Sequence, residues 1–104
     1  MTLIELVSIL KTTGLPLAYH HFDDPPALPY MIYLEDGTSN VIADNKVYKK
    51  VMNIRIELYT NKKDLAAEKT LEDVLNENEL PFDADETYIE SERLFQRIYE
   101  IGVI

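Results

Sequence analysis

The chain has 104 residues, no cysteine and a formal net charge of -9 at pH 7, from 10 basic and 19 acidic side chains. The absence of cysteine excludes disulfide bonds, a thiol nucleophile and a zinc site built on thiolates. The acidic balance argues against sequence-specific nucleic-acid binding, because such binding needs basic side chains that neutralise phosphates.

No apolar run approaches the roughly 20 residues that cross a bilayer, so we expect no membrane partner. The segment from Met1 to Leu10 lacks the basic start of a signal peptide, which favours the cytosol. The length corresponds to a single domain over residues 1–104. The charge is uneven, since residues 51–104 hold 6 basic and 13 acidic side chains, a balance of -7.

The N-terminal segment predicts a helix from Leu3 to about Thr12. Thr2 and Glu5 have the spacing of a capping box. The apolar stripe of this helix consists of Leu3, Leu6, Val7 and Leu10. Ile4 and Ile9 lie off that stripe, so either the helix is buried broadly or its second face meets a neighbouring subunit.

Pro16 prevents a clean continuation of the helix, and the alternation from Leu17 to Phe22 allows a short extended segment. Residues 23–29 contain three prolines and predict a loop.

One cluster in this region has metal-ligand character, and it consists of His20, His21, Asp23 and Asp24. Adjacent histidines in an extended chain point to opposite faces, so both do not easily serve one ion. We therefore expect ordinary residues beside the loop, with no metal and no cofactor.

The next segment predicts an antiparallel meander. Tyr30–Leu34 is a strand, the Asp-Gly pair at Asp36 is a strong turn signal, and Asn40–Ala43 returns as a second strand. A protruding loop is expected from about Ser39 to Lys46.

Residues Val51–Tyr59 predict the long central strand, paired on both sides. Apolar and polar residues alternate there with a period of two, which is typical of a strand half buried against a core. The apolar side carries Met52, Ile54, Ile56 and Leu58, and the other side carries Asn53, Arg55 and Glu57.

After this strand the period changes, and the sequence predicts a helix from Leu65 to about Asn76 with Asp64 as its N-cap. Its sheet-facing residues are expected to be Leu71, Val74 and Leu75. An acidic outer surface is expected from Glu68, Glu72, Asp73 and Glu77, which lie mostly off the apolar face.

The C-terminal part predicts two strands. Asp83–Ile89 is an edge strand guarded by acidic residues, and a calcium site there lacks the glycine and distal glutamate of the EF-hand pattern. Leu94–Ile101 is the last strand, with apolar residues on both sides, and a helix is the competing interpretation. The predicted fold is α+β, a mainly antiparallel sheet of four to six strands flanked by two helices, in the order α-β-β-β-α-β-β.

Four stretches together carry a family resemblance. They are residues 10–19 with 22–26, residues 29–34 with 43–48, residues 54–64, and residues 90–101. In this order and spacing the chain resembles the small tail-completion (tail-terminator, head–tail joining) proteins of long-tailed phages and prophages of Gram-positive bacteria. The likeness covers nearly the whole chain.

The resemblance implies a structural protein with a helix-flanked sheet, no catalytic residues and no cofactor. Such proteins assemble as rings, commonly hexameric, at the head-proximal end of the tail tube. There they stop tube growth and present a surface to the head connector or stopper protein. The expected partners are therefore further copies of the chain, the tail-tube protein and the connector. The expected location is the host cytoplasm during assembly and then the virion tail.

A closed ring needs a head-to-tail contact between different surfaces of each copy. The candidate contact residues are Ile4, Ile9, Asn40, Asp44, Lys46, Tyr48, Leu94 and Ile98. The candidate lining of a channel that repels DNA is Glu68, Glu72, Asp73 and Glu77.

Two other readings stay open. One is a different head–tail connector or minor tail component. The other is an acidic binding module, for example a DNA mimic, which would be a stable monomer with a salt-sensitive complex with a basic partner. A hydrolase has no support, because no nucleophile, base and orienting group can be named together.

Overall fold

The computed structural model of the chain describes residues 1–43 and 46–104, and the side chains of residues 40–49 lie outside that description. Two helices and five strands follow one another in the predicted order. They are α1 (Leu3–Lys11), β1 (Leu17–Tyr19), β2 (Tyr30–Ala43), β3 (Lys46–Thr60), α2 (Leu65–Glu77), β4 (Asp83–Ile89) and β5 (Leu94–Val103). The predicted α+β class is confirmed.

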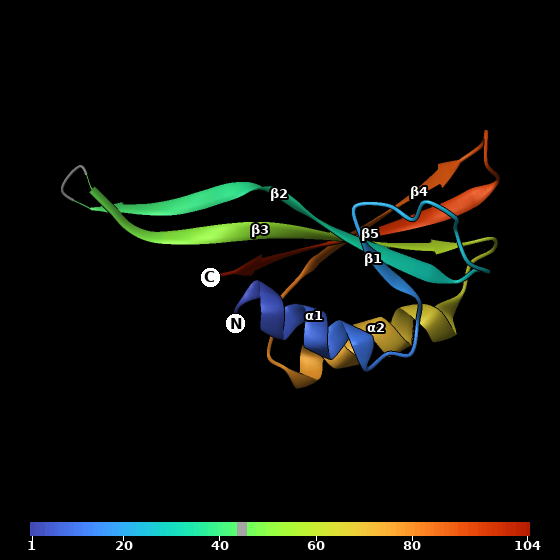
Figure 1. Cartoon of the computed structure of the whole chain (residues 1–104), viewed down its shortest axis with the longest axis horizontal. Coiled ribbons are helices and arrows are strands. Elements are labelled where there is room, and N and C mark those ends of the chain that lie inside the picture. Colours follow the sequence, from blue (N-terminus) through green and yellow to red (C-terminus); the bar gives the residue numbers. More distant parts are fainter. Residues whose placement is uncertain (44–45) are drawn as a thin grey trace.

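The strands form one sheet in the order β1-β2-β3-β5-β4. β1 runs parallel to β2, and every other neighbouring pair is antiparallel. Both helices lie on the same face of the sheet (Figure 1). β3 pairs with β2 and with β5, so the predicted central strand is confirmed, and residues 94–101 form a strand rather than a helix.

The core lies between the sheet and the helices. The period-two alternation places Ile54, Ile56 and Leu58 of β3 toward α1 and α2, where each is at most 1% exposed. Fully or nearly buried partners from the other elements are Leu6, Leu10, Met31, Leu71, Leu75, Tyr99 and Val103. Val74, which the sequence placed with the packing residues of α2, is only half-buried.

The predicted helix starts are confirmed by their caps. The Glu5 backbone N–H donates to the Thr2 hydroxyl oxygen (3.2 Å), and the Thr2 backbone N–H donates to the Glu5 carboxylate (3.2 Å), which closes the capping box. The Ala67 backbone N–H donates to Asp64 Oδ1 (3.0 Å) at the start of α2. Gly14 follows α1 with a φ of 77°, a conformation that glycine adopts without strain.

The predicted turn at Asp36 is wrong. β2 continues through this point, and the register jumps from Glu35↔Ile54 to Thr38↔Met52, so two residues of β2 oppose one residue of β3. Such a β-bulge absorbs an extra residue and twists the strand, and Gly37 accommodates it with a φ of 84°. The Asp-Gly pair therefore kinks a long strand instead of reversing the chain.

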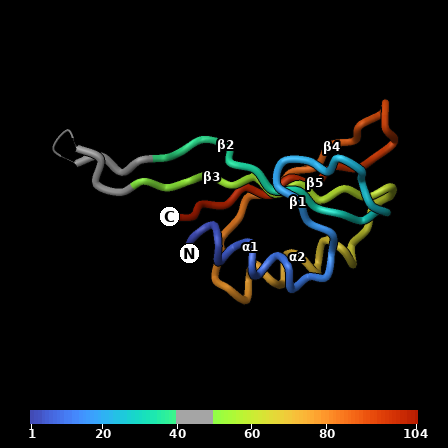
Figure 2. The backbone as a smooth tube through the Cα atoms, in the orientation of Figure 1, coloured from blue at the N-terminus to red at the C-terminus, as the bar shows by residue number. Residues whose placement is uncertain are grey.

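The predicted loop from Ser39 to Lys46 is also shorter than expected, because β2 runs to Ala43 and β3 begins at Lys46. β2 and β3 thus form one long hairpin, which gives the molecule an extent of 49 Å along its longest axis against 29 and 24 Å along the others. Figure 2 follows this path of the backbone, with the two chain ends close together. The Ile104 backbone N–H donates to the Met1 carbonyl oxygen (2.9 Å). Among the described helices, none is long and apolar enough to cross a membrane.

Candidate interaction surface

The outer part of the β2–β3 hairpin, called the arm below, consists of Asp36–Ala43 and Lys46–Val51. β1 pairs with β2 only at residues 31–33, and β5 pairs with β3 only from Met52 onward. Within the described chain, both outer edges of the arm therefore lack a neighbouring strand. The arm extends away from the helices and from the rest of the sheet (Figure 1).

A two-stranded ribbon without a core is marginally stable by itself. Its unpaired N–H and C=O groups are also a template for another strand. The arm therefore has the physical character of a contact surface for a second chain.

The sheet face opposite the helices, called the open face below, carries a row in which Ile32, Glu57 and Ile98 are neighbours in register. Ile98 and Leu94, which the sequence proposed as contacts, are both half-buried on this face. Glu57 is only 6% exposed although both helices lie on the opposite face of the sheet. A carboxylate buried in this way must be neutralised or hydrogen-bonded.

The partners of Glu57 come from its own strand, and β5 joins the network through Tyr59. Arg55 Nε lies 2.6 Å from Glu57 Oε2, and its N–H is not aligned for a hydrogen bond, so the contact is an ion pair. The Tyr59 hydroxyl donates to Glu57 Oε1 (2.7 Å), and the Gln96 side-chain amide donates to the Tyr59 hydroxyl oxygen (2.9 Å). Sequence reasoning missed this network. The signal was the spacing of Arg55, Glu57 and Tyr59 on one strand face.

Two tyrosines, Tyr59 and Tyr99, make the free energy of unfolding fall at alkaline pH. Burial and the hydrogen bond to Glu57 raise the pKa of Tyr59 above its ordinary value of 10.0, and burial and the hydrogen bond to Glu72 raise the pKa of Tyr99 in the same way. The folded state therefore holds these protons more tightly than the unfolded state. The corresponding stability is complete below pH 10.0 and is lost as the pH rises above it.

We expect the free energy of unfolding in urea to fall as the pH rises above 10.0, and to fall less steeply in a Tyr99→Phe variant. Tyr88→Phe is the matched control, because it removes the same hydroxyl group from a side chain that is 48% exposed. Equal slopes for the wild type and the Tyr99→Phe variant would contradict this assignment.

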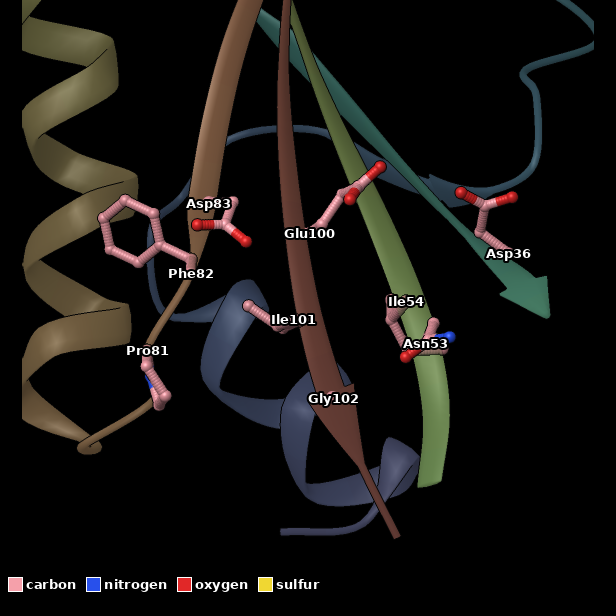
Figure 3. A pocket seen from close by; sticks show the side chains of 9 residues that line it. All are labelled: Asp36, Asn53, Ile54, Pro81, Phe82, Asp83, Glu100, Ile101 and Gly102. Atoms are coloured by element: carbon pink, nitrogen blue, oxygen red, sulfur yellow. The ribbon is translucent and has the colours of Figure 1, made fainter. Parts of the chain in front are cut away.

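An acidic hollow of about 430 Å³ lies where β5 passes between β3 and β4. Its carboxylates belong to Asp36, Asp83 and Glu100, and Figure 3 shows these side chains on three different strands around it. A second hollow of about 410 Å³ adjoins it on the open face, lined by Asp85, Arg55 and Ile98 among others. In the part of the chain that the structure describes, neither hollow is lined by a nucleophile with a base and an orienting group.

The four carboxylates of α2 do not share one outer surface. Glu68 is only 7% exposed, which corrects the prediction that it lies outward. Its oxygens lie 2.8 Å from Lys63 Nζ and 3.1 Å from Arg97 Nε. Glu72 is half-buried and accepts a hydrogen bond from the Tyr99 hydroxyl (2.7 Å). These two side chains tie α2 to the sheet.

The other two carboxylates of α2 remain near its surface. Asp73 lies 2.6 Å from Lys69 Nζ, one helical turn earlier, and Glu77 is exposed. Of the four predicted carboxylates, only Asp73 and Glu77 therefore lie on the outer surface of α2.

The histidine cluster differs from the sequence expectation in its geometry. His20 has a φ of 69°, so the chain is not extended there, and the Nδ1 atoms of His20 and His21 approach to 3.3 Å. His21 Nε2 lies 3.1 Å from Asp23 Oδ1. In the described part of the chain, no group of three or more His, Cys, Asp or Glu side chains is arranged to hold a metal ion.

The remaining candidate contacts fall in two places. Ile4 is 81% exposed on α1, whereas Ile9 is half-buried and packs against the core. Asn40, Lys46 and Tyr48 belong to the strands of the arm, with side chains outside the described part of the structure. Asp44 lies wholly outside the described residues.

Fold and surface define a small α+β domain with a projecting two-stranded arm, an open sheet face and an acidic edge. No protein-family model matches the chain, and no curated protein matches it.

Proposed function

We propose that the chain is a structural tail-completion protein of a long-tailed phage or prophage. In this role it assembles as a ring, hexameric in the assembled tail, that ends the tail tube and joins it to the head connector. The proposal rests on the four sequence stretches that resemble this family over nearly the whole chain. The helix-flanked, mainly antiparallel sheet agrees with what the resemblance implies about fold.

The structural observation that carries the proposal is the arm. A subunit of a closed ring needs two different complementary surfaces, one on each side, so that each copy contacts the next head to tail. An arm that projects from one part of the molecule, with unpaired edges, supplies a surface of this kind. Its partners in this proposal are further copies of the chain, the tail-tube protein and the connector.

The acidic surface has a role in the same proposal. Negative side chains on the inner wall of the ring would keep passing DNA from adhering, because like charges repel at short range. Asp73 and Glu77 are the residues of α2 that we assign to this wall, since Glu68 and Glu72 are engaged with the sheet.

The test is to mix the protein with the tail-tube protein encoded beside it and to image the mixture by negative-stain electron microscopy. We expect rings, or tubes whose growth stops at one capped end. A variant in which residues 41–49 are replaced by an Asn-Gly turn keeps the Asn40↔Lys50 pairing. It should fold, because no core residue in the described part of the chain belongs to the arm, and it should cap poorly. Unlimited growth of uncapped tubes beside the free wild-type protein would overturn the proposal.

The acidic binding module is the second candidate, and the observation that favours it is the exposed acidic end of the sheet. Asp83, Asp85, Glu86, Glu90 and Glu92 are all exposed on β4 and the following turn. This function predicts a stable monomer that leaves tubes uncapped and binds a basic protein in a complex that weakens with added salt. The tube experiment therefore separates the two candidates.

A further inference from the structure

We propose that copies of the chain join by extending one sheet into the next. The β3 edge of the arm, Lys46–Val51, would pair with the outer edge of β4, Asp83–Ile89, in a neighbouring copy. This inference rests on the proposed ring function, and it names the two surfaces that meet.

The first argument is that both edges are free and similar in length. β4 pairs with β5 on its inner side only and is the last strand of the sheet. Six of its seven residues are exposed, and Ile89 is half-buried. The free part of β3 has six residues, from Lys46 to Val51, so the two segments can pair along nearly their whole lengths.

The second argument is charge. The segment Lys46–Val51 contains three lysines and no acidic residue, and Lys50 is exposed. β4 contains Asp83, Asp85 and Glu86 and no basic residue. Acidic residues on an edge strand ordinarily keep like edges apart, and here they would repel a second β4 while attracting the lysine-bearing edge.

The carboxylates available for this contact can be named. Glu86 already lies 3.0 Å from Lys63 Nζ of its own chain. In the part of the chain that the structure describes, Asp83 and Asp85 make no ion pair, and both border the hollows on the open face. These two carboxylates are thus the ones that a neighbouring lysine would meet.

The third argument is that the contact cannot form within one chain. β5 lies between β3 and β4 in the sheet, and the arm extends beyond the end of β5. The arm must therefore reach β4 of another copy, which gives a head-to-tail contact that can close by rotation into a ring.

The absence of cysteine allows a clean cross-linking test. Lys50→Cys and Asp85→Cys variants are prepared separately, mixed with the tail-tube protein, and oxidised. A disulfide needs Cα atoms within about 7 Å, so a mixed dimer reports strand pairing between copies. We expect this dimer from the mixture, and we expect none when a Leu65→Cys variant, also exposed but at the start of α2, replaces the Asp85→Cys variant.

Charge reversal provides the second readout. We expect Lys49→Glu/Lys50→Glu to weaken self-association about tenfold, and Asp83→Lys/Asp85→Lys to do the same, because each turns about two attractive charge pairs of the proposed contact into repulsive ones. An equal mixture of the two variants should recover association through the contact in which both charges are reversed. The control variant Glu90→Lys/Glu92→Lys changes the net charge as much as Asp83→Lys/Asp85→Lys does, but its residues lie outside β4. It should weaken self-association less.

The outcomes separate this inference from the proposed function. Capped tubes without the mixed disulfide, or with capping unchanged by either reversal, would overturn the edge pairing and leave tail completion standing. A failure of the reversed variants to recover on mixing would also overturn the edge pairing. Wild-type protein that neither self-associates nor caps tubes would overturn both.

Discussion

Replacement of Ile56 by alanine will lower the free energy of unfolding by about 2–5 kcal/mol, the range for large-to-small changes in a closed core. Ile56 is 0% exposed in the middle of β3, with Tyr33 and Tyr99 as its neighbours in register. Removing its methyl and methylene groups would leave a cavity between the sheet and the helices. Because small domains are stable by only about 5–15 kcal/mol, urea denaturation will show the loss clearly.

The matched control is Ile4→Ala, which removes the same atoms from a side chain that is 81% exposed. We expect its effect on unfolding to stay within about 0.5 kcal/mol. Similar losses for the two variants would contradict the assigned core. Ile4→Ala is also informative in the tube assay, because Ile4 is a candidate contact, and a folded variant that caps poorly would place α1 in an interface.

Elements whose signals are local could be predicted from the sequence. The capping box of α1, the Asp64 cap of α2 and the alternation of β3 depend on residues within a few positions of one another. A short-range pattern of this kind is sufficient to define an element and its buried face. The order of elements then restricts the sheet, because neighbouring strands along the chain usually pair.

The arm could not be predicted, because the Asp-Gly pair at Asp36 and Gly37 is compatible with two different structures. An Asp-Gly pair supports a hairpin turn, and a glycine with positive φ equally supports a bulge inside a strand. The choice depends on whether the strand after Gly37 continues to pair with β3. That pairing runs from Thr38↔Met52 to Ala43↔Lys46. It is a relation between segments, which the composition of either segment does not reveal.

The buried carboxylates were missed for a similar reason. Helical spacing places Glu68 beside the apolar stripe, and a glutamate at such a boundary is usually solvated. Its burial depends on Lys63 before the helix and on Arg97 on β5, which reach it from different parts of the chain. The sequence shows each charged residue, but only the fold brings Lys63 and Arg97 next to Glu68.

Among the candidate contact residues, those with a local sequence pattern could be predicted and those that depend on tertiary packing could not. The sequence could indicate the two-sided apolar pattern of β5, and the structure places Leu94 and Ile98 on the open face. It left open whether Ile9 packs against the core or meets a neighbouring subunit, because α1 lies over the sheet at an angle that only tertiary packing sets.

Replacement of Arg97 by methionine will lower the free energy of unfolding by about 2–4 kcal/mol, somewhat less than a fully buried ion pair would cost because the Arg97 side chain is 23% exposed. Arg97 Nε lies 3.1 Å from Glu68 Oε1, and its N–H donates to the Tyr99 hydroxyl oxygen (2.9 Å). Without it, Glu68 keeps only Lys63, and Glu72 loses its nearest positive charge. Methionine retains most of the side-chain packing, so the loss reports mainly on charge.

Lys69→Met is the control, because Lys69 also neutralises a carboxylate of α2 but does so in an exposed pair with Asp73. We expect that variant to unfold at nearly the same urea concentration as the wild type, because an exposed ion pair contributes little to stability. The deficit of the Arg97→Met variant should shrink in a Glu68→Gln/Glu72→Gln background, because neutral side chains no longer need the cation. A deficit that stayed the same in that background would mean that Arg97 acts through packing. The Arg97–Glu68 contact would then contribute little to holding α2 on the sheet.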